Sequence, residues 1–180
     1  LHGSSAASDV YKRQTLLRCL YLSIVLIFSI MIGSEDFSLI PESESIIKPL
    51  PKPYERKIIT EQELINFINT STNQPIVIFG ANWCPDCQIL SAVLSLPSVK
   101  QYIDAHFSIM LVDLGRYDIN MNLLEVVGIE QKDGVPRVII FDRNRKAINL
   151  STNDIWRTAR DSSPQDIFNY FQSFKQDINN

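Results

Sequence analysis

The sequence predicts an α/β domain in which helices flank a central mixed β-sheet. Short apolar runs rich in β-branched residues lie at residues 76–79, 107–114 and 137–141, as is typical of buried strands. Segments with the helical spacing of apolar residues separate these runs. The predicted order of elements is α-β-α-β-α-β-β-α, and this order favours helices layered against one sheet.

The first helix is predicted to begin after Thr60, because Thr60 and Glu63 form a capping-box pattern. It ends near residues 73–75, and its apolar face holds Leu64, Ile65, Phe67 and Ile68. The first strand follows directly. A second helix is predicted from Cys84 to about Ser95, with the inward residues Ile89, Leu90, Val93 and Leu94.

The second half of the chain continues the alternation. After the strand at residues 107–114, a helix is predicted at residues 120–127, and Gly128 stops it. Residues 137–141 and 146–150 are predicted to form a hairpin.

A last helix is predicted from Ser163 and Pro164, with Ser as its cap and Pro at its first position. Its apolar stripe consists of Ile167, Phe168, Phe171 and Phe174. The preceding residues 151–162 contain Trp156, Arg157 and Arg160 but no motif. Either a partner-contacting insertion or an irregular connection would fit them.

The N-terminal residues divide into two segments that we expect to lie outside the domain. Residues 1–14 resemble the translation of a sequencing adapter, so we expect an artefact there; a genuine polar tail is the alternative. Residues 15–34 hold Arg18, an apolar run of 13 residues and the pair Gly33-Ser34, which is a signal-peptide pattern. A bilayer-spanning helix needs roughly 20 apolar residues. We therefore predict export, with an uncleaved N-terminal membrane anchor as the main alternative.

Residues 35–57 are rich in Pro, Ser and Glu, and we predict a linker there. Pro49, Pro51 and Pro53 should keep this stretch extended and semi-rigid. A ligand for a proline-binding domain is the alternative. The folded domain is predicted to span residues 58–180.

The charge of the chain limits its partners. The full chain has 17 basic and 20 acidic residues and a net charge of −3. Residues 1–34 contain three basic residues and one acidic residue, so 14 basic and 19 acidic residues remain without them, a net charge of −5. This mild acidity favours solubility and argues against nucleic acid as a partner. We expect a monomer.

Two cysteines, Cys84 and Cys87, remain when residues 1–34 are set aside. In an oxidising compartment such a pair is either a locked disulfide or a redox centre. The predicted helix N-terminus favours a thiolate at Cys84, and Cys87 lies about one turn later, within disulfide reach. Cys84 would attack a substrate disulfide and Cys87 would resolve the mixed disulfide. Pro85 suits the first helical turn, and Trp83 would form an apolar wall beside the sulfur.

Two segments resemble the thioredoxin superfamily. Residues 81–87, which contain Trp83-Cys84-Pro85-Asp86-Cys87, resemble its active-site segment, and Gly134-Val135-Pro136 before a strand resembles its cis-proline loop. The resemblance covers roughly residues 57–178, and residues 113–136 are similar to exported bacterial thioredoxin-like proteins.

This resemblance implies a thioredoxin-like fold and a thiol–disulfide oxidoreductase whose redox group is the Cys84–Cys87 disulfide, with no other cofactor. It implies that substrate docks beside Pro136, where a cis Val135–Pro136 bond would leave the Val135 backbone free to pair with an extended segment. It also implies a periplasmic protein, or one anchored in the membrane and facing the periplasm.

Three positions depart from the family pattern. Ile78 stands where many thioredoxins carry a buried Asp, so that proton acceptor is missing. Asp86 would disfavour a second negative charge beside the sulfurs, or would be a solvated residue at the helix start. Arg137 would stabilise a thiolate or select acidic substrates, or would lie on the surface.

Other roles for the cysteines remain open at this stage. A zinc site needs four ligands, and only Cys84, Cys87 and His106 are at hand, so we expect no metal site there. The leading prediction is reduction of protein disulfides, with a membrane or soluble thiol electron donor. Alternatives are a disulfide oxidant or isomerase, a cytochrome-maturation reductase, and a non-catalytic binding module with this fold.

Overall fold

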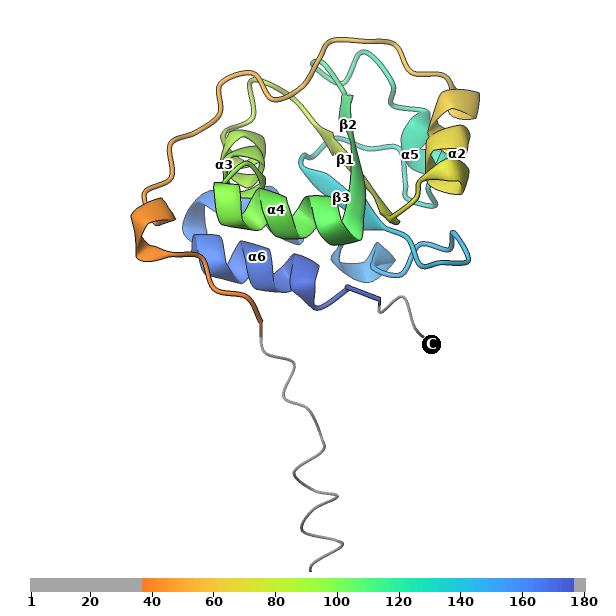
Figure 1. Ribbon diagram of the computed structural model, residues 1–180. Helices are drawn as coiled ribbons and strands as arrows, with labels where there is room; N and C mark the ends of the chain where they lie inside the picture. Colours follow the sequence, from red (N-terminus) through yellow and green to blue (C-terminus); the bar gives the residue numbers. More distant parts are fainter. Residues whose placement is uncertain (1–36, 177–180) are drawn as a thin grey trace, which may run out of the picture. The chain divides into compact units, whose positions relative to one another are not determined.

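A three-stranded sheet of order β2-β1-β3 forms the centre of the fold in a computed structural model, which describes residues 37–176 (Figure 1). The helices are α2 (Glu61–Thr70), α3 (Pro85–Leu94), α4 (Pro97–His106), α5 (Leu123–Val126) and α6 (Pro164–Gln172). The strands are β1 (Gln74–Gly80), β2 (Phe107–Asp113) and β3 (Arg137–Ile140). Three 3-10 segments are η1 (Glu42–Glu44), η2 (Leu150–Thr152) and η3 (Ile155–Asp161).

The sheet is mixed, as predicted, because β1 pairs in parallel with β2 and antiparallel with β3. All residues of β1 are buried, since helices cover both faces of the sheet (Figure 1). Successive strand residues point to opposite faces. Ile76 and Ile78 therefore pack with residues of α3, α4 and α6, whereas Val77 and Phe79 pack with residues of α2 and α5.

The predicted capping box at α2 is confirmed. Thr60 Oγ1 accepts a hydrogen bond from the Glu63 backbone N–H at 3.1 Å, and Glu63 Oε2 accepts one from the Thr60 N–H at 2.7 Å. The hydrogen bond from the Thr60 backbone, helped by its hydroxyl, lowers the pKa of Glu63 to about 2. The predicted cap of α6 is also present, because the Ser163 side chain accepts from the Asp166 N–H.

The hairpin prediction is wrong for its second strand, whereas its first strand is present as β3. Residues 146–150 form no strand, and only a single bridge joins Phe141 to Ala147. The Asn149 side chain takes over the pairing instead. Its Oδ1 accepts from the Ile140 N–H and its Nδ2 donates to the Val138 carbonyl, both at 2.8 Å. A side chain thus satisfies the backbone of β3 where a second strand was expected.

Two helix predictions also change. The sequence analysis assigned no element to α4, which begins at Pro97, an N1 position that Pro tolerates. The helix predicted at residues 120–127 shortens to α5 because Asn120 has a positive φ of 56°. The Asn120 side chain donates to the carbonyls of Asp113 and Lys57 and is held out of the helix.

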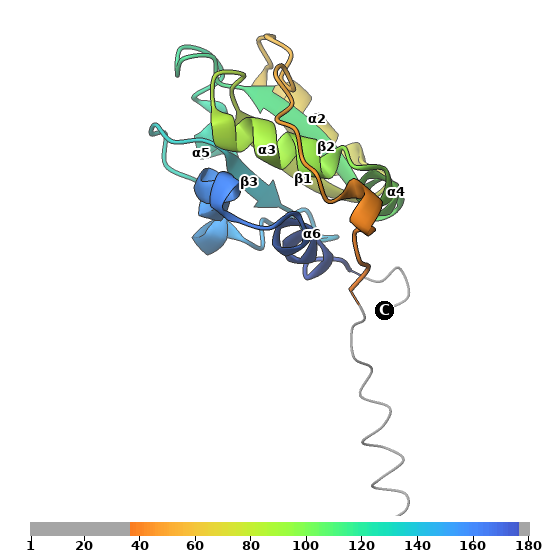
Figure 2. The same cartoon turned by 90° about the vertical axis from the view of Figure 1, so that its left-hand side faces the viewer.

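The segment predicted as a spacer packs against the domain from Ser38 onward. Glu44 accepts from the Ser98 N–H at 3.0 Å, at the start of α4, and the Leu50 N–H donates to the Gln88 carbonyl of α3. Figure 2 shows this orange segment alongside α3. Residues 38–57 therefore belong to the folded unit, and we call them the strap.

The predictions for residues 1–34 lie outside the described residues. Within residues 37–176, no helix is both long enough and apolar enough to cross a bilayer.

Candidate active site

Cys84 lies at the N-terminus of α3, directly after the loop that leaves β1. Its φ of −86° and ψ of 116° are extended, and it is the N-cap residue of the helix. Cys84 Sγ accepts a hydrogen bond from the Cys87 backbone N–H at 3.2 Å. The first turn of α3 therefore directs a backbone donor and the positive end of the helix dipole at this sulfur.

The two thiols are buried and differ in acidity. Cys84 is 3% exposed and Cys87 is fully buried, and both are free thiols. A hydrogen bond from the Cys87 thiol, with a further one from the Cys87 amide, lowers the pKa of Cys84 against the opposing effect of burial. Burial and the neighbouring Cys84 raise the pKa of Cys87 well above its usual value. Cys84 is therefore the group suited to attack, and Cys87 stays protonated until Cys84 has reacted.

The loop before β3 faces Cys84. The Val135–Pro136 bond is cis, and the Val135 carbonyl accepts from Cys84 Sγ at 3.6 Å. The Gly134 N–H donates to the Tyr117 hydroxyl at 3.0 Å. The structure thus brings Val135 and the cysteine pair together although about 50 residues separate them in the chain.

Trp83 borders the site on the side of the loop that follows β2. Its indole Nε1 donates to the Gly115 carbonyl at 2.6 Å, and its ring meets the edge of Tyr117 at a centroid distance of 5.6 Å. The side chain remains 42% exposed. A fixed, partly exposed aromatic surface therefore lies beside Cys84.

Asp86 is not a solvated helix-start residue, so that alternative from the sequence is wrong. The residue is 6% exposed. Its Oδ1 accepts two hydrogen bonds from Arg160, one from the backbone N–H and one from Nε, both at 3.0 Å. Sequence analysis identified no role for Arg160, because 74 residues separate it from Asp86.

Arg137 is not a surface residue, so that alternative is also wrong. It is 4% exposed; its Nε donates to the Gly134 carbonyl at 2.8 Å and its Nη1 to Asn153 Oδ1 at 3.0 Å. The guanidinium therefore holds the loop that carries Val135 and Pro136.

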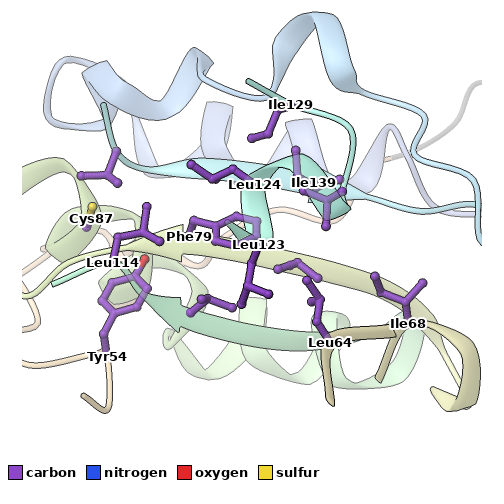
Figure 3. Packing of buried hydrophobic residues seen from close by; sticks show 14 of the residues in the cluster. Tyr54, Leu64, Ile68, Phe79, Cys87, Leu114, Leu123, Leu124, Ile129 and Ile139 are labelled. Carbon is purple, nitrogen blue, oxygen red and sulfur yellow. The ribbon is translucent and has the colours of Figure 1, made fainter. Parts of the chain in front are cut away.

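Tyr54 is a second residue that sequence analysis missed. Ile78 is fully buried and brings no carboxylate, whereas Tyr54 of the strap reaches the same cluster as Cys84 and Cys87 (Figure 3). Burial, with a smaller effect of Cys87, raises the pKa of Tyr54 well above its usual value. No sequence signal marked Tyr54, because it lies in the segment predicted as a spacer.

The ring of Tyr54 covers Gly80, where a Cβ would lie 2.2 Å from its Cζ atom. Asn82 fixes the Tyr54 backbone from the site loop, with Asn82 Oδ1 accepting from the Tyr54 N–H at 2.9 Å and Asn82 Nδ2 donating to the Tyr54 carbonyl at 2.8 Å. The strap is thereby attached to the loop between β1 and Cys84.

Metal-ligating side chains do not converge in the part of the chain that the structure describes. No three His, Cys, Asp or Glu residues among residues 37–176 form a group that could hold an ion. His106 ends α4, with its ring 4.5 Å from that of Tyr102.

Comparison with known proteins supports the same interpretation. No family model matches this sequence, and no curated protein matches it. Among solved structures, it is similar to the disulphide isomerase from Xylella fastidiosa Temecula1, with a TM-score of 0.60 and 26% identity. The similarity covers 67% of this chain and 95% of that chain. With its mixed sheet, flanking helices and Cys84–Cys87 pair, the chain is a thiol–disulfide oxidoreductase with a thioredoxin-like fold.

Proposed function

We propose that this protein reduces disulfides in other proteins, outside the cytoplasm, through a cycle of Cys84 and Cys87. The observation that carries this proposal is the placement of the two thiols: Cys84 Sγ accepts the Cys87 N–H at the start of α3, and Cys87 is fully buried. Cys84 at the helix N-terminus has a lowered pKa, and the fully buried Cys87 has a raised pKa. Such a contrast fits a nucleophile followed by a resolving thiol.

The proposed reaction has two exchange steps. The Cys84 thiolate attacks one sulfur of the substrate disulfide, so that a mixed disulfide forms and the substrate S–S bond breaks. The released substrate sulfur takes up a proton. Cys87 then loses its proton and attacks Cys84 Sγ, which releases the second substrate thiol. The substrate gains two electrons, and the protein becomes a Cys84–Cys87 disulfide that a dithiol donor must reduce.

Asp86 supports reduction over oxidation. A stabilised nucleophilic thiolate stabilises the reduced protein, which makes it a stronger oxidant. Although hydrogen bonds from Cys87 lower the pKa of Cys84, the Asp86 carboxylate acts in the opposite direction. A buried negative charge next to the pair therefore limits thiolate stabilisation and favours a reductant.

The neighbouring residues have proposed roles in substrate binding. We assign the exposed face of Trp83 to contact with the substrate beside the scissile disulfide. The Val135 backbone would pair with an extended substrate segment next to Pro136. Pro85 occupies the first helical position and holds the spacing of the thiols, and Arg137 positions the docking loop.

We base the proposed location on residues 15–34. A signal-peptide pattern there supports a periplasmic protein, with an N-terminal anchor facing the periplasm as the alternative. The electron donor would be a membrane-borne or soluble dithiol protein.

Disulfide isomerisation is the second candidate, because the similar structure from Xylella fastidiosa Temecula1 is described as a disulphide isomerase. Isomerisation requires the same attack by Cys84 but returns Cys84 to the thiol without net electron transfer. Cys87 would then be needed only to rescue stalled mixed disulfides.

Two assays distinguish these functions. With dithiothreitol as the electron source, a reductase should accelerate precipitation of insulin chains, and the Cys87→Ser variant should lose this activity. An isomerase should reactivate scrambled ribonuclease A, and Cys87→Ser should retain most of that reactivation. Absence of both activities in the wild-type protein would contradict an exchange function and favour a binding module.

Replacing Asp86 with Asn should make the protein more oxidising. Removing the carboxylate lowers the pKa of Cys84 and stabilises the dithiol form, because no buried negative charge then opposes formation of the thiolate. We expect the equilibrium with glutathione at pH 7 to shift roughly three- to tenfold toward the dithiol. Glu61→Gln, which removes a charge at the exposed start of α2, is the control and should leave that equilibrium unchanged. A shift toward the disulfide in Asp86→Asn would contradict the role given to Asp86.

A further inference from the structure

The segment η3 packs against α3 and contacts the residue between the two cysteines through an ion pair. Arg160 lies near the end of η3, and both its backbone N–H and its Nε donate to Asp86 Oδ1 at 3.0 Å. Asp86 in turn lies in the first turn of α3, between Cys84 and Cys87. Side-chain exposure is 9% for Asp86 and 56% for Arg160, so a nearly buried anion faces a half-exposed cation.

Burial of Asp86 requires such a partner. A carboxylate removed from water is costly unless hydrogen bonds and an opposite charge compensate it. The Arg160 backbone N–H holds the carboxylate in place, and the guanidinium supplies the charge. A side-chain substitution at Arg160 therefore removes the charge and the Nε hydrogen bond, and it leaves the backbone hydrogen bond that holds the carboxylate.

Among the described residues, other titratable groups also interact electrostatically with Cys84 or with Arg160. They are Cys87, Tyr54, Tyr117 and Asp161; Asp113 and Asp133 act on the two tyrosines. Burial raises the pKa of both Tyr54 and Tyr117, so the tyrosines stay neutral while Cys84 titrates. Arg160 is the cation that meets Asp86 directly.

We propose that Arg160 is a positioning residue that tunes Cys84 through Asp86: its guanidinium compensates the carboxylate, so that the Cys84 thiolate forms despite a neighbouring negative charge. Residues 151–162, which carry no sequence motif, thereby take part in the chemistry of the site. This inference rests on the proposed exchange function for its biological meaning, but its test depends only on the reactivity of a thiol.

The direction of the effect follows from electrostatics. Without the Arg160 guanidinium, Asp86 opposes ionisation of Cys84 fully, and the pH at which Cys84 becomes half ionised rises. The Arg160 guanidinium is half-exposed, so solvent screens its charge and the effect is moderate. Fewer Cys84 thiolates would then be present at a pH below that midpoint, roughly two- to fivefold fewer.

The test measures alkylation of Cys84 by iodoacetamide across pH in the reduced full-length protein. Fragment-ion mass spectrometry assigns the label to Cys84 and distinguishes it from Cys19 and Cys87. The midpoint of the rate profile reports ionisation and does not depend on how nucleophilic the thiolate is. We expect Arg160→Gln to raise the midpoint and Arg160→Lys, which retains the charge, to stay near wild type. Arg145→Gln is the matched control, because Arg145 donates to the Ser71 carbonyl at 2.9 Å, before the start of β1, whereas Cys84 follows the end of that strand.

The double variant decides whether Arg160 acts through Asp86. In an Asp86→Asn background, Arg160→Gln should shift the midpoint much less than it does in the wild type. An equal shift in both backgrounds would overturn the proposal, and so would a wild-type midpoint in Arg160→Gln. A shift of similar size in Arg145→Gln would show a general charge effect and would also overturn it.

Redox equilibrium gives an independent measurement. Arg160→Gln should move the glutathione equilibrium roughly two- to fivefold toward the disulfide, and a tenfold change corresponds to about 30 mV. An alkylation midpoint that shifts as expected in a protein without insulin or ribonuclease activity would refute the proposed function but leave the role of Arg160 intact. Insulin or ribonuclease activity in the wild-type protein, with no shift of the alkylation midpoint in Arg160→Gln, would support the proposed function and refute the role of Arg160.

Discussion

Replacing Cys84 with Ser should lower insulin reduction by at least about a thousandfold, because the reaction has no nucleophile without this sulfur. Cys84 is the thiol that the helix N-terminus and the Cys87 N–H prepare for attack. A serine hydroxyl in the same place stays protonated at neutral pH and forms no mixed disulfide. The measurement is the initial rate of insulin precipitation with dithiothreitol.

The Cys87→Ser variant should stop at the mixed disulfide, because Cys84 still attacks the substrate disulfide but no second thiol releases the substrate. We expect a covalent complex with substrate on non-reducing gels that disappears on reduction. Cys19→Ser is the matched control and should react as the wild type does. Retained activity in Cys84→Ser, or a trapped complex in Cys84→Ser and none in Cys87→Ser, would contradict these assignments.

Replacing Tyr54 with Ala should cost about 3–5 kcal/mol of unfolding free energy, the range for loss of a large buried aromatic ring. Tyr54 is 3% exposed and packs over Gly80 in the cluster that contains Phe79 and Leu114 (Figure 3). Its removal leaves a cavity beside the cysteine pair and removes the apolar contact of the strap with the core, while the backbone hydrogen bonds to Asn82 remain. The urea midpoint should fall accordingly.

Two control variants distinguish the stability that the Tyr54 ring contributes from the effect of changing any residue of the strap. Tyr54→Phe keeps the ring and should retain most of the stability. Ile46→Ala changes a strap residue that is 84% exposed and should alter stability by less than about 0.5 kcal/mol. A Tyr54→Ala variant as stable as Ile46→Ala would show that the Tyr54 ring does not stabilise the fold.

Local patterns account for the elements that were predicted well. The capping residues Thr60 and Ser163 act within one turn of their own helices, so sequence alone placed both helix starts. The strand runs are apolar because both faces of the sheet are covered. Only α4 was missed among the longer helices, because Pro97 at its first position was not recognised as a helix start.

Long-range contacts account for the errors. A strand at residues 146–150 would require its backbone to pair with β3. The Asn149 side chain forms hydrogen bonds with the β3 backbone instead. Arg137 was expected on the surface as one alternative, yet Asn153 and the Gly134 carbonyl make its burial tolerable. Neither partner can be inferred from local spacing.

By itself, the sequence determined the reaction centre: two cysteines one helical turn apart, at the junction of a buried strand and a helix, behind a tryptophan. These features depend on spacing and on helix geometry, which act over a few residues. Only the tertiary structure decided the surroundings of that centre. It placed Arg160 on Asp86 and Tyr54 beside the thiols. Burial of a carboxylate or a ring depends on what distant segments bring to it, and no local pattern encodes that.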